Sequence, residues 1–272
     1  MTDSECNSMN NTYEIYAVHY GHHDRKGHEN FIGGDPHETG NMPLDYFVWV
    51  IQGGGKTFVL DTGFAPDMQK KRGRQIIRPV AEGLESIGVE PSKVSDVIIS
   101  HMHYDHAGNI PLFANARFHI QDAEMRFVTG RSMCHSVIRH SFEAEHVSQM
   151  VTRVFNDKVQ FHDGVDELAP GLTLHKVGGH TKGLQVTRVK TKRGFVVLAS
   201  DAAHLYANLD RNHPYPTLVD VDDYMEAFVT IRKLASSEAH IVPGHDPDVL
   251  KRYPLAKSGL AGVVRLDVEP KA

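Results

Sequence analysis

Apolar residues along the chain fall into two kinds of pattern, and the first kind predicts strands. Continuous apolar runs such as LDYFVWVIQ (44–52) and DVIIS (96–100) are typical of buried strands. Glycine and polar residues separate these runs and indicate the turns between them. Strands are predicted in this way at 13–20, 44–52, 56–63, 96–100, 117–121, 171–177, 184–190, 195–200 and 239–242.

Apolar residues spaced three or four positions apart predict the helices. A helix is expected over 74–87 from an amphipathic stripe that a glycine then ends. This stripe consists of Ile77, Val80, Leu84 and Ile87. Further helices are predicted at 122–129, 137–154 and 221–236. In the last of these helices, Met225, Phe228 and Val229 are expected to face inward.

Two connections between the predicted elements have unusual composition. The glycine triplet 53–55 lies between two predicted strands and no helix follows it, so we expect a hairpin turn rather than a phosphate-binding loop. Residues 21–43 are rich in Gly, His and Asp and are predicted to form a long irregular loop, which in a compact domain usually carries function. No change in composition divides the chain, so a single domain of layered α and β elements is expected over residues 1–272.

Composition and charge exclude several classes of protein. The net charge of −5 argues against a nucleic-acid-binding surface, and no apolar run reaches the roughly 18–20 residues of a membrane span. Two cysteines, Cys6 and Cys134, cannot form a disulfide framework. The polar and acidic start of the chain is unlike a secretory signal. We therefore expect a cytoplasmic protein that binds neither membranes nor nucleic acids.

The segment SHMHYDHAGN (100–109) places metal-binding side chains directly after a predicted buried strand. These side chains are His101, His103, Asp105 and His106. Neutral imidazole and carboxylate are ligands of zinc and of other divalent first-row ions. A solvent-exposed polar loop is the alternative, but this density of ligands at the end of a strand favours a metal site.

Three further candidate ligands also follow apolar runs. His180 lies in GGHTKG, Asp201 follows FVVLAS, and His245 lies in PGHD. Each of them alone would be consistent with a cap or a surface residue. Together with the first motif they supply the additional ligands that a metal site needs.

The combined motifs resemble those of the metallo-β-lactamase superfamily. The matching segments are H-x-H-x-D-H at 101–106, GGHTKG at 178–183, Asp201, PGH at 243–245 and DTG at 61–63. Within this superfamily, SHMHYDHAGN and the stretch 117–125 are most similar to the N-acyl homoserine lactonase branch. The resemblance covers about residues 44–250 and implies an α/β fold, the four-layer αβ/βα sandwich, with the site at strand ends between two sheets. The early loop 21–43 and the helical stretch 125–155 are expected to line the pocket.

The resemblance also implies two divalent metal ions, and zinc is the expected ion, although manganese, iron and cobalt accept the same ligands. His101, His103 and His180 are assigned to one ion, Asp105, His106 and His245 to the other, and Asp201 bridges both. In addition, Asp105 is expected to pass a proton to the leaving group.

One position departs from the lactonase pattern. That branch often carries a tyrosine three residues after the bridging aspartate, where this chain has His204, with Tyr206 two residues further on. We predict that His204 lies beside the site and orients the carbonyl or the leaving oxygen, with a pocket-wall or helix-start position as the alternative. Asp61 is expected either to accept a hydrogen bond from a ligand imidazole or simply to form its turn.

This site predicts a metal-dependent hydrolase acting on a small molecule. Two ions sharing a water lower its pKa toward neutrality, so a metal-bridging hydroxide is expected to attack a carbonyl. The lactonase resemblance predicts a lactone, either an N-acyl homoserine lactone or a related cyclic ester. A thioester, lactam or cyclic amide is the alternative on the same site. His103 argues against a flavodiiron-type oxidoreductase, and the full ligand set argues against a non-catalytic metal-binding protein.

Other residues are expected to lie outside the metal site. His119 and His175 fall within strands and are predicted to be packed or surface residues. The early histidines are predicted to be solvated loop residues, with the pocket rim as the alternative; they are His19, His22, His23, His28 and His37. Apolar residues of the helical stretch are candidates either to line a groove for an acyl chain or to belong to the core; they are Met133, Phe142 and Met150.

Overall fold

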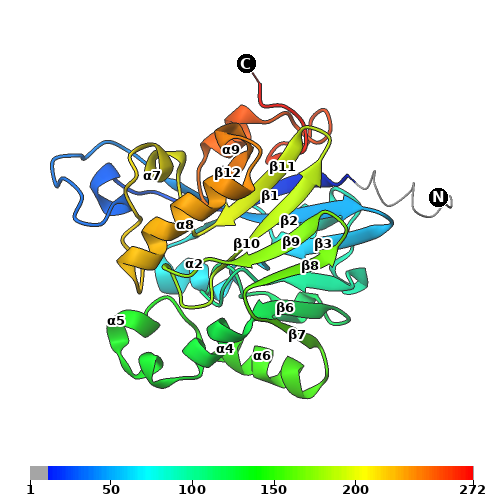
Figure 1. The fold of residues 1–272 in the computed structure, drawn as a ribbon, viewed down its shortest axis with the longest axis horizontal. Coiled ribbons are helices and arrows are strands. Elements are labelled where there is room, and N and C mark those ends of the chain that lie inside the picture. The colour runs from blue at the N-terminus through cyan, green and yellow to red at the C-terminus, as the bar shows by residue number, and fades with distance from the viewer. Residues whose placement is uncertain (1–11, 272) are drawn as a thin grey trace.

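The computed structural model describes residues 12–271, so Cys6 and the start of the chain lie outside the described residues. The first of two β-sheets contains β1 (Glu14–His23), β2 (Leu44–Gly53), β3 (Lys56–Leu60), β4 (Gln75–Ile76), β5 (Asp96–Ile98), β6 (Arg117–Gln121), β7 (Val159–His162) and β13 (Val263–Arg265). The second contains β8 (Val165–Ala169), β9 (Leu172–Lys176), β10 (Gln185–Thr191), β11 (Gly194–Ser200) and β12 (Ile241–Pro243). The strand orders are β13-β1-β2-β3-β5-β6-β7, with β4 paired to β1, and β12-β11-β10-β9-β8 (Figure 1).

Helices lie between these strands along the chain. The α-helices are α2 (Asp67–Arg72), α3 (Val80–Glu85), α4 (Asp122–Val128), α5 (Ser136–Arg139), α6 (Ala144–Phe155), α7 (Tyr206–Asp210), α8 (Val221–Leu234) and α9 (Asp248–Arg252). Short 3-10 turns cover Gly27–Asn30, Pro91–Lys93, Ile110–Leu112, Arg131–Cys134 and Glu238–His240.

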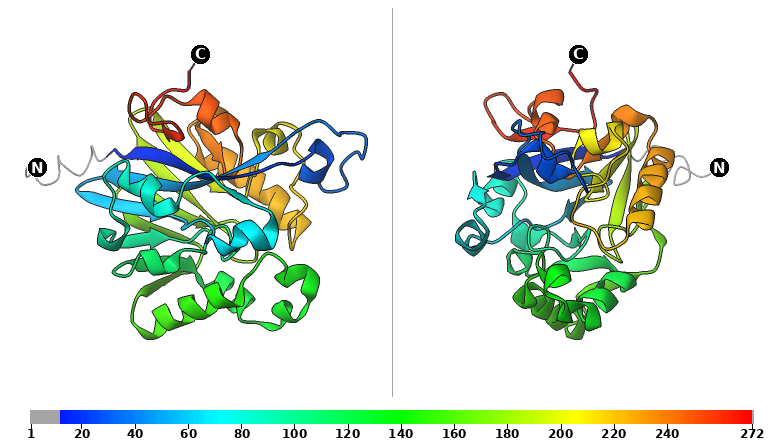
Figure 2. Two further views of the ribbon diagram at one scale, coloured as in Figure 1. Left: turned by 180° about the vertical axis from the view of Figure 1, so that it is seen from behind. Right: turned by 90° about the vertical axis from the view of Figure 1, so that its left-hand side faces the viewer.

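Three apolar cores define the layers of the fold. One core joins the first sheet to α2, α3, α4 and α6, a second lies between the sheets, and a third joins the second sheet to α8. Along β11, Val196 and Leu198 belong to the core between the sheets, whereas Val197 and Ala199 belong to the core under α8. Because successive strand residues point to opposite faces, a continuous apolar run is buried on both sides. Figure 2 shows α8 outside the second sheet, and the predicted four-layer αβ/βα sandwich is confirmed.

Strand direction brings the candidate ligands to one edge of the sheets. β5 runs parallel to β3 and β6, and β11 runs parallel to β12. The carboxyl ends of parallel neighbours lie at the same edge, where α/β proteins commonly place their ligands. The turns after β3, β5, β11 and β12 carry Asp61, the 101–106 motif, Asp201 and His245, respectively.

The prediction of one helix over 74–87 is wrong in its first half. Residues Gln75–Ile76 pair with β1 as β4, and Ile77 is 55% exposed. Pro79 has extended backbone with ψ 139°, and a proline also disfavours helical geometry in the residue before it. The helix therefore begins at Val80.

Two other helix predictions need correction. The helix predicted over 137–154 is divided into α5 and α6, because the chain between them forms a backbone bridge from Phe142 to His103. Val229 was expected to face inward but is 39% exposed; the buried face of α8 contains Phe228 together with Tyr224, Ala227 and Ile231. The hairpin turn at 53–55 is confirmed, with φ of 57° at Gly54 and 74° at Gly55, as a tight two-residue turn requires.

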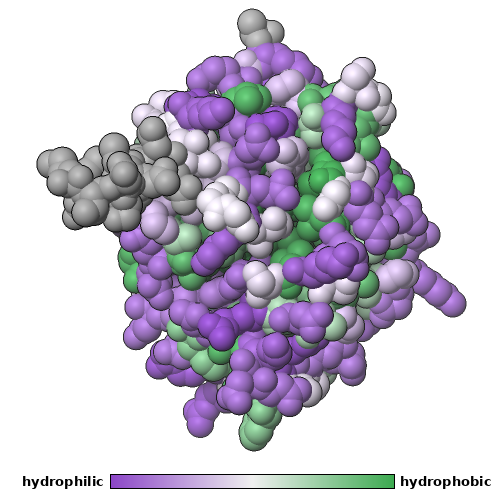
Figure 3. All heavy atoms as spheres, turned by 90° about the vertical axis from the view of Figure 1, so that its right-hand side faces the viewer, coloured by the Kyte–Doolittle hydropathy of each residue, from purple (hydrophilic) through white to green (hydrophobic). Residues whose placement is uncertain are grey.

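The molecular surface offers no broad apolar face on the side that Figure 3 shows. Hydrophilic residues predominate there, and apolar residues gather in a narrow strip. Exposed large apolar side chains such as Val137, Phe155 and Val165 lie apart in the sequence. Among residues 12–271, no helix is long and apolar enough to cross a membrane.

Candidate metal centre

The structure brings all seven predicted ligands together in one buried cluster. Three groups have potential ligand atoms that all lie within 4.8 Å of one another, a spacing compatible with a shared ion. The first group consists of His101, His103, His180 and Asp201, and the second of Asp105, His106 and His245. The membership of these two groups matches the two sets assigned from the sequence. The third group consists of Asp201, His204 and His245.

The carboxylate of Asp201 lies between the two groups, with one oxygen toward each. Its Oδ2 is 3.0 Å from His180 Nε2 and 3.8 Å from His101 Nε2. Its Oδ1 is 3.0 Å from His245 Nε2 and 3.2 Å from His106 Nε2. A single carboxylate is thus positioned to contact two ions, one through each oxygen.

In four of the ligand histidines, the ring nitrogen that points away from the cluster contacts another group. His106 Nδ1 lies 2.7 Å from Asp61 Oδ2, and Ser100 Oγ lies 3.0 Å from His101 Nδ1. The carbonyl of Thr217 is 2.6 Å from His180 Nδ1, and that of Asp45 is 3.1 Å from His245 Nδ1. Such contacts fix the tautomer and leave the opposite nitrogen free to bind a metal.

Two inward nitrogens face Asp201 but form no hydrogen bond. These are His101 Nε2 and His106 Nε2, which are buried without a hydrogen bond among the described residues. A buried polar atom without a partner is costly, so it marks a position where a bound group is expected. Nitrogen and carboxylate donors in this number fit zinc-type ions.

Electrostatics keep three of the ligands in the forms that bind metals. Burial lowers the pKa of His101 and His103 well below the usual range, so both rings are neutral. Burial alone would raise the pKa of Asp201, but His204, His106 and the other surrounding histidines hold it well below its usual range, so the carboxylate is ionised. The pKa of His106 moves the other way, since Asp201, Asp61 and Asp105 together outweigh the effect of burial.

Asp61 fulfils both of the roles expected for it. It directly follows β3 and adopts the left-handed region, with φ 63°, and so forms the turn. Its carboxylate also accepts hydrogen bonds from Ser100 N at 2.7 Å and Ser100 Oγ at 2.8 Å, besides contacting His106. Ser200, directly before Asp201, has φ 45°, so a second non-glycine residue with strained backbone adjoins the cluster.

Glu124 was missed by the sequence analysis as a residue that supports the site. Its buried carboxylate accepts hydrogen bonds from Met102 N at 2.9 Å, Thr181 Oγ1 at 2.7 Å and Gly183 N at 3.0 Å. It therefore joins the 101–106 motif to the segment that carries His180. The only signal in the sequence is an acidic residue in a segment that otherwise reads as an amphipathic helix.

His204 is buried against the cluster, and both of its nitrogens have a neighbour. Nδ1 is 3.2 Å from the hydroxyl of Tyr224, which donates its proton to the carbonyl of Asp201 at 2.8 Å. Nε2 faces Asp201 Oδ2 at 3.0 Å. Burial lowers the pKa of His204 to about 3, so the ring is neutral. The ring stacks on Tyr215 with centroids 3.6 Å apart.

A cavity of about 130 Å³ opens onto the cluster. Arg25 from the early loop and His140 and Ser141 from the helical stretch line it, together with Asp105 and His204. The early histidines are absent from its lining. His19, His22 and His23 belong to β1 rather than to a loop, which corrects the prediction for them.

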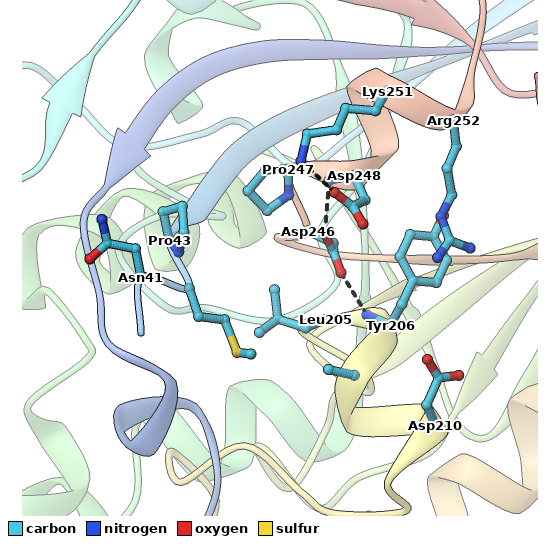
Figure 4. A pocket seen from close by; sticks show the side chains of 12 residues that line it. Asn41, Pro43, Leu205, Tyr206, Asp210, Asp246, Pro247, Asp248, Lys251 and Arg252 are labelled. Carbon is cyan, nitrogen blue, oxygen red and sulfur yellow. Dashed lines mark hydrogen bonds and ion pairs between the residues drawn. The ribbon is translucent and has the colours of Figure 1, made fainter. Parts of the chain in front are cut away.

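The lining of a second cavity, of about 310 Å³, includes Leu205 and Asp246, which directly follow His204 and His245 in the sequence (Figure 4). Its acidic residues have structural partners: Asp246 accepts a hydrogen bond from Tyr206 N at 2.8 Å, and Lys251 pairs with Asp248 at 2.7 Å. The two loops that carry these histidines are joined by a hydrogen bond from His245 N to the carbonyl of His204 at 2.9 Å. These hydrogen bonds hold the two loops together next to the cluster.

The remaining candidates lie outside the cluster. His119 contacts Asp96 and His162 at 3.0 and 3.1 Å, and His175 contacts Thr173 at 2.8 Å. Met150 belongs to the core under the first sheet, and Met133 packs against that core. Phe142 is buried in the same core and also places its ring 4.4 Å from that of His103.

Comparison with known proteins agrees with this geometry. Residues 42–245 match the family model of the metallo-beta-lactamase superfamily. An N-acyl homoserine lactonase of Bacillus sp is 29% identical over 165 residues, which are 60% of this chain and 60% of that protein. N-acyl homoserine lactonase AiiB of Agrobacterium fabrum is 28% identical over 225 residues, covering 73% of this chain and 78% of that one. A solved quorum-quenching N-acyl homoserine lactone lactonase superposes with a TM-score of 0.72 at 20% identity, over 86% of this chain and 92% of the other.

Proposed function

The chain belongs to the metallo-beta-lactamase superfamily, and on that premise we propose that it is a two-metal hydrolase that opens a lactone ring. The relatives with lactonase names support an N-acyl homoserine lactone or a related cyclic ester as the substrate. The observation that carries the proposal is the position of Asp201, whose two oxygens each face a separate set of histidines.

The donors fit two divalent ions, and we take zinc as the ion that nitrogen and carboxylate ligands favour. His101, His103 and His180 would hold one ion, Asp105, His106 and His245 the other, and Asp201 both. When bound, such ions acidify a water and polarise a carbonyl, and this is the chemistry that they would supply.

The residues of the chain prepare the site for this chemistry. The groups that hold the outer ring nitrogens keep the histidine lone pairs pointing inward, so little reorganisation is needed on binding. Asp105 lines the cavity and is only partly buried, and both observations support a role in which its carboxylate accepts a proton and passes it to a departing oxygen. We also propose that one domain carries the whole site, since strands from both ends of the chain pair with each other as β1 and β13.

A thioester is the second candidate substrate, and one observation favours it. Lys71, Arg72, Arg74 and Arg139 line a cavity next to the metal cluster, which would suit the anionic carrier of a thioester. A lactam or cyclic amide would use the same metal chemistry without needing these cations.

Product identity tests the proposed reaction. Metal-loaded protein should convert a lactone into one hydroxy acid, with a mass gain of one water and no second fragment, measured by mass spectrometry. Thioesters, β-lactams and phosphodiesters should be incubated in parallel under the same conditions. If every lactone stays intact while a thioester or a β-lactam is cleaved, the lactone proposal fails.

A prediction for His204 follows from its position beside Asp201 and His245. Its Nε2 lies 3.0 Å from Asp201 Oδ2, and its ligand atom groups with those of Asp201 and His245, so we propose that His204 acts as an additional donor to a metal ion held by these residues. His204→Ala should weaken the binding of one of the two ions roughly 10–100-fold, a loss typical for residues that support a metal site. Zinc titration against a competing chelator measures this change.

The outcomes of the His204→Ala experiment separate its possible roles. Unchanged zinc affinity with reduced turnover would support a role at the leaving oxygen instead. Unchanged affinity and unchanged turnover would leave His204 as a packing residue of the pocket wall. His204→Tyr, which restores the residue that the lactonase branch often carries, is the matched variant.

A further inference from the structure

Arginine side chains surround the opening of the metal cavity. Arg25, Arg72 and Arg74 all line it, although they come from two separate segments of the chain. Arg72 forms an ion pair with Glu143 at 2.6 Å. Arg25 and Arg74, by contrast, have no ion pair with a carboxylate anywhere in residues 12–271. Two arginines beside the candidate metal centre thus have no carboxylate in ion-pair contact among the described residues.

Neutral groups hold Arg74 in place. Its Nε donates to the hydroxyl of Tyr104 at 2.7 Å, and its Nη1 donates to the carbonyl of Arg72 at 2.7 Å and lies 3.0 Å from His23 Nε2. No hydrogen bond from Nη2 is found within the described part of the chain. A guanidinium presents five N–H groups in a fixed fork, so the donors of Nη2 remain available to a bound molecule.

Arg25 is held in the same manner. Its Nε donates to Asn30 Oδ1 at 2.8 Å, its Nη2 donates to the carbonyl of Glu29, and its guanidinium lies 5.3 Å from the centre of the Tyr215 ring. Tyr215 in turn stacks on His204. Arg25 is therefore connected to the metal cluster through two stacked rings, and its position is set before any ligand binds.

The positive charge continues into the neighbouring cavity, which is about 530 Å³ in volume. Lys71 and Arg139 join Arg72 and Arg74 in its lining, with Glu143 as the one carboxylate there. Arg139 hydrogen-bonds only to backbone carbonyls, those of Met133 and Cys134. This concentration of cations contrasts with the net charge of −5 of the whole chain, so it is a local feature. Such a concave, cationic region attracts anions.

We propose that the substrate carries an anionic group, a carboxylate or a phosphate, which Arg74 and Arg25 bind while the bond to be cleaved lies at the metal cluster. This inference rests on the proposed hydrolysis and narrows its substrate class. The planar fork of arginine matches the oxygens of both groups. The carboxylates that line the cavity, Asp105 and Asp201, belong to the metal cluster, and neither is in ion-pair contact with Arg25 or Arg74. A lactone with an uncharged acyl chain would leave both arginines without an anionic partner.

The experiment compares three γ-lactones that differ only in one substituent: a carboxylate, a phosphate monoester or a neutral carboxamide. Wild-type enzyme should have a lower KM for at least one anionic lactone than for the carboxamide. In Arg74→Gln, the ratio of kcat/KM between that anionic lactone and the carboxamide should fall roughly 10–100-fold, the usual effect of losing a charge-assisted hydrogen bond. The carboxylate and phosphate arms identify which anion the site prefers.

Matched variants keep the result interpretable. Arg74→Lys retains the charge and should recover part of the ratio. Arg117→Gln removes an exposed arginine at the start of β6, whereas the metal cluster lies where the strands end. This variant should therefore leave the ratio of kcat/KM unchanged. Arg25→Gln should lower the ratio in the same direction as Arg74→Gln.

Binding of the ring-opened products, measured by calorimetry, needs no turnover and separates this inference from the proposed reaction. Tighter binding of an anionic product than of the carboxamide product, lost in Arg74→Gln, supports the inference even if the lactones are not hydrolysed. If the enzyme hydrolyses thioesters but no lactone, and prefers anionic thioesters to neutral ones, the inference is supported and the lactone proposal fails. Equal binding and equal kcat/KM for charged and neutral compounds in wild type would overturn it and leave the lactonase proposal standing.

Discussion

Asp201→Ala is expected to cause the largest loss of activity of any single ligand replacement. Its two oxygens face different histidine sets at 3.0 Å each, so alanine removes a donor from both proposed ion positions at once. The loss should exceed the roughly 10–100-fold that replacing a supporting partner of a metal ligand costs. Hydrolysis rates and metal content should be measured together on the same preparation.

The control for this variant is another buried aspartate. Asp267 accepts a hydrogen bond from Ile15 N at 3.1 Å and pairs with Arg265 at 2.6 Å, outside the metal cluster. Asp267→Ala should reduce stability but leave metal content unchanged. If Asp201→Ala keeps its metal content and its turnover, the bridging role is wrong.

Removing metal should have the largest effect on stability. Six buried imidazoles surround the carboxylate of Asp201 in the cluster: those of His101, His103, His106, His180, His204 and His245. Without a metal ion, the ring nitrogens that point into the cluster have few partners. An ion present at about 1,000 times its Kd stabilises the folded state by about 4 kcal/mol, which corresponds to roughly 10 °C in Tm for a domain of this size. Thermal unfolding before and after dialysis against a chelator measures this shift.

Restoration of zinc after dialysis is the control for this experiment. Activity and Tm should return together, since both depend on the same ligands. An unchanged Tm in protein shown to be free of metal would argue that these histidines are packed residues of the core and not ligands.

The ligand cluster could be anticipated from the sequence because its members lie directly after strands. The apolar run before His101 and the one before Asp201 both read as buried strands, and parallel strands place their ends at one edge. The fold class followed from the resemblance, while the three separate cores became visible only in three dimensions. Local patterns cannot reveal which faces of two sheets pack together.

The groups around the ligands were harder to anticipate, because long-range packing places them. Arg74 lies 30 residues from its hydrogen-bond partner Tyr104, and Tyr224 lies 20 residues from His204. Glu124 supports two motifs that are far apart in the sequence, yet locally it is one acidic residue in a helix. The break between α5 and α6 was missed for the same reason, since it depends on a backbone bridge between Phe142 and His103.

The strands β7, β8 and β13 were missed because their residues do not read as buried runs. Strand β8 (VDELA) is exposed or half-exposed throughout, and β13 has only three residues. Strand β13 nevertheless closes the first sheet by pairing with β1. Edge strands of this kind gain their stability from the neighbouring strand rather than from their own pattern.

The central claim is that these side chains hold two divalent ions at a hydrolytic site. Elemental analysis of zinc-reconstituted, desalted protein, with activity measured on the same sample, tests it most directly. We predict close to two ions per chain in fully active protein, falling with activity in Asp201→Ala. One ion or none per chain in protein of full activity would contradict the two-metal site.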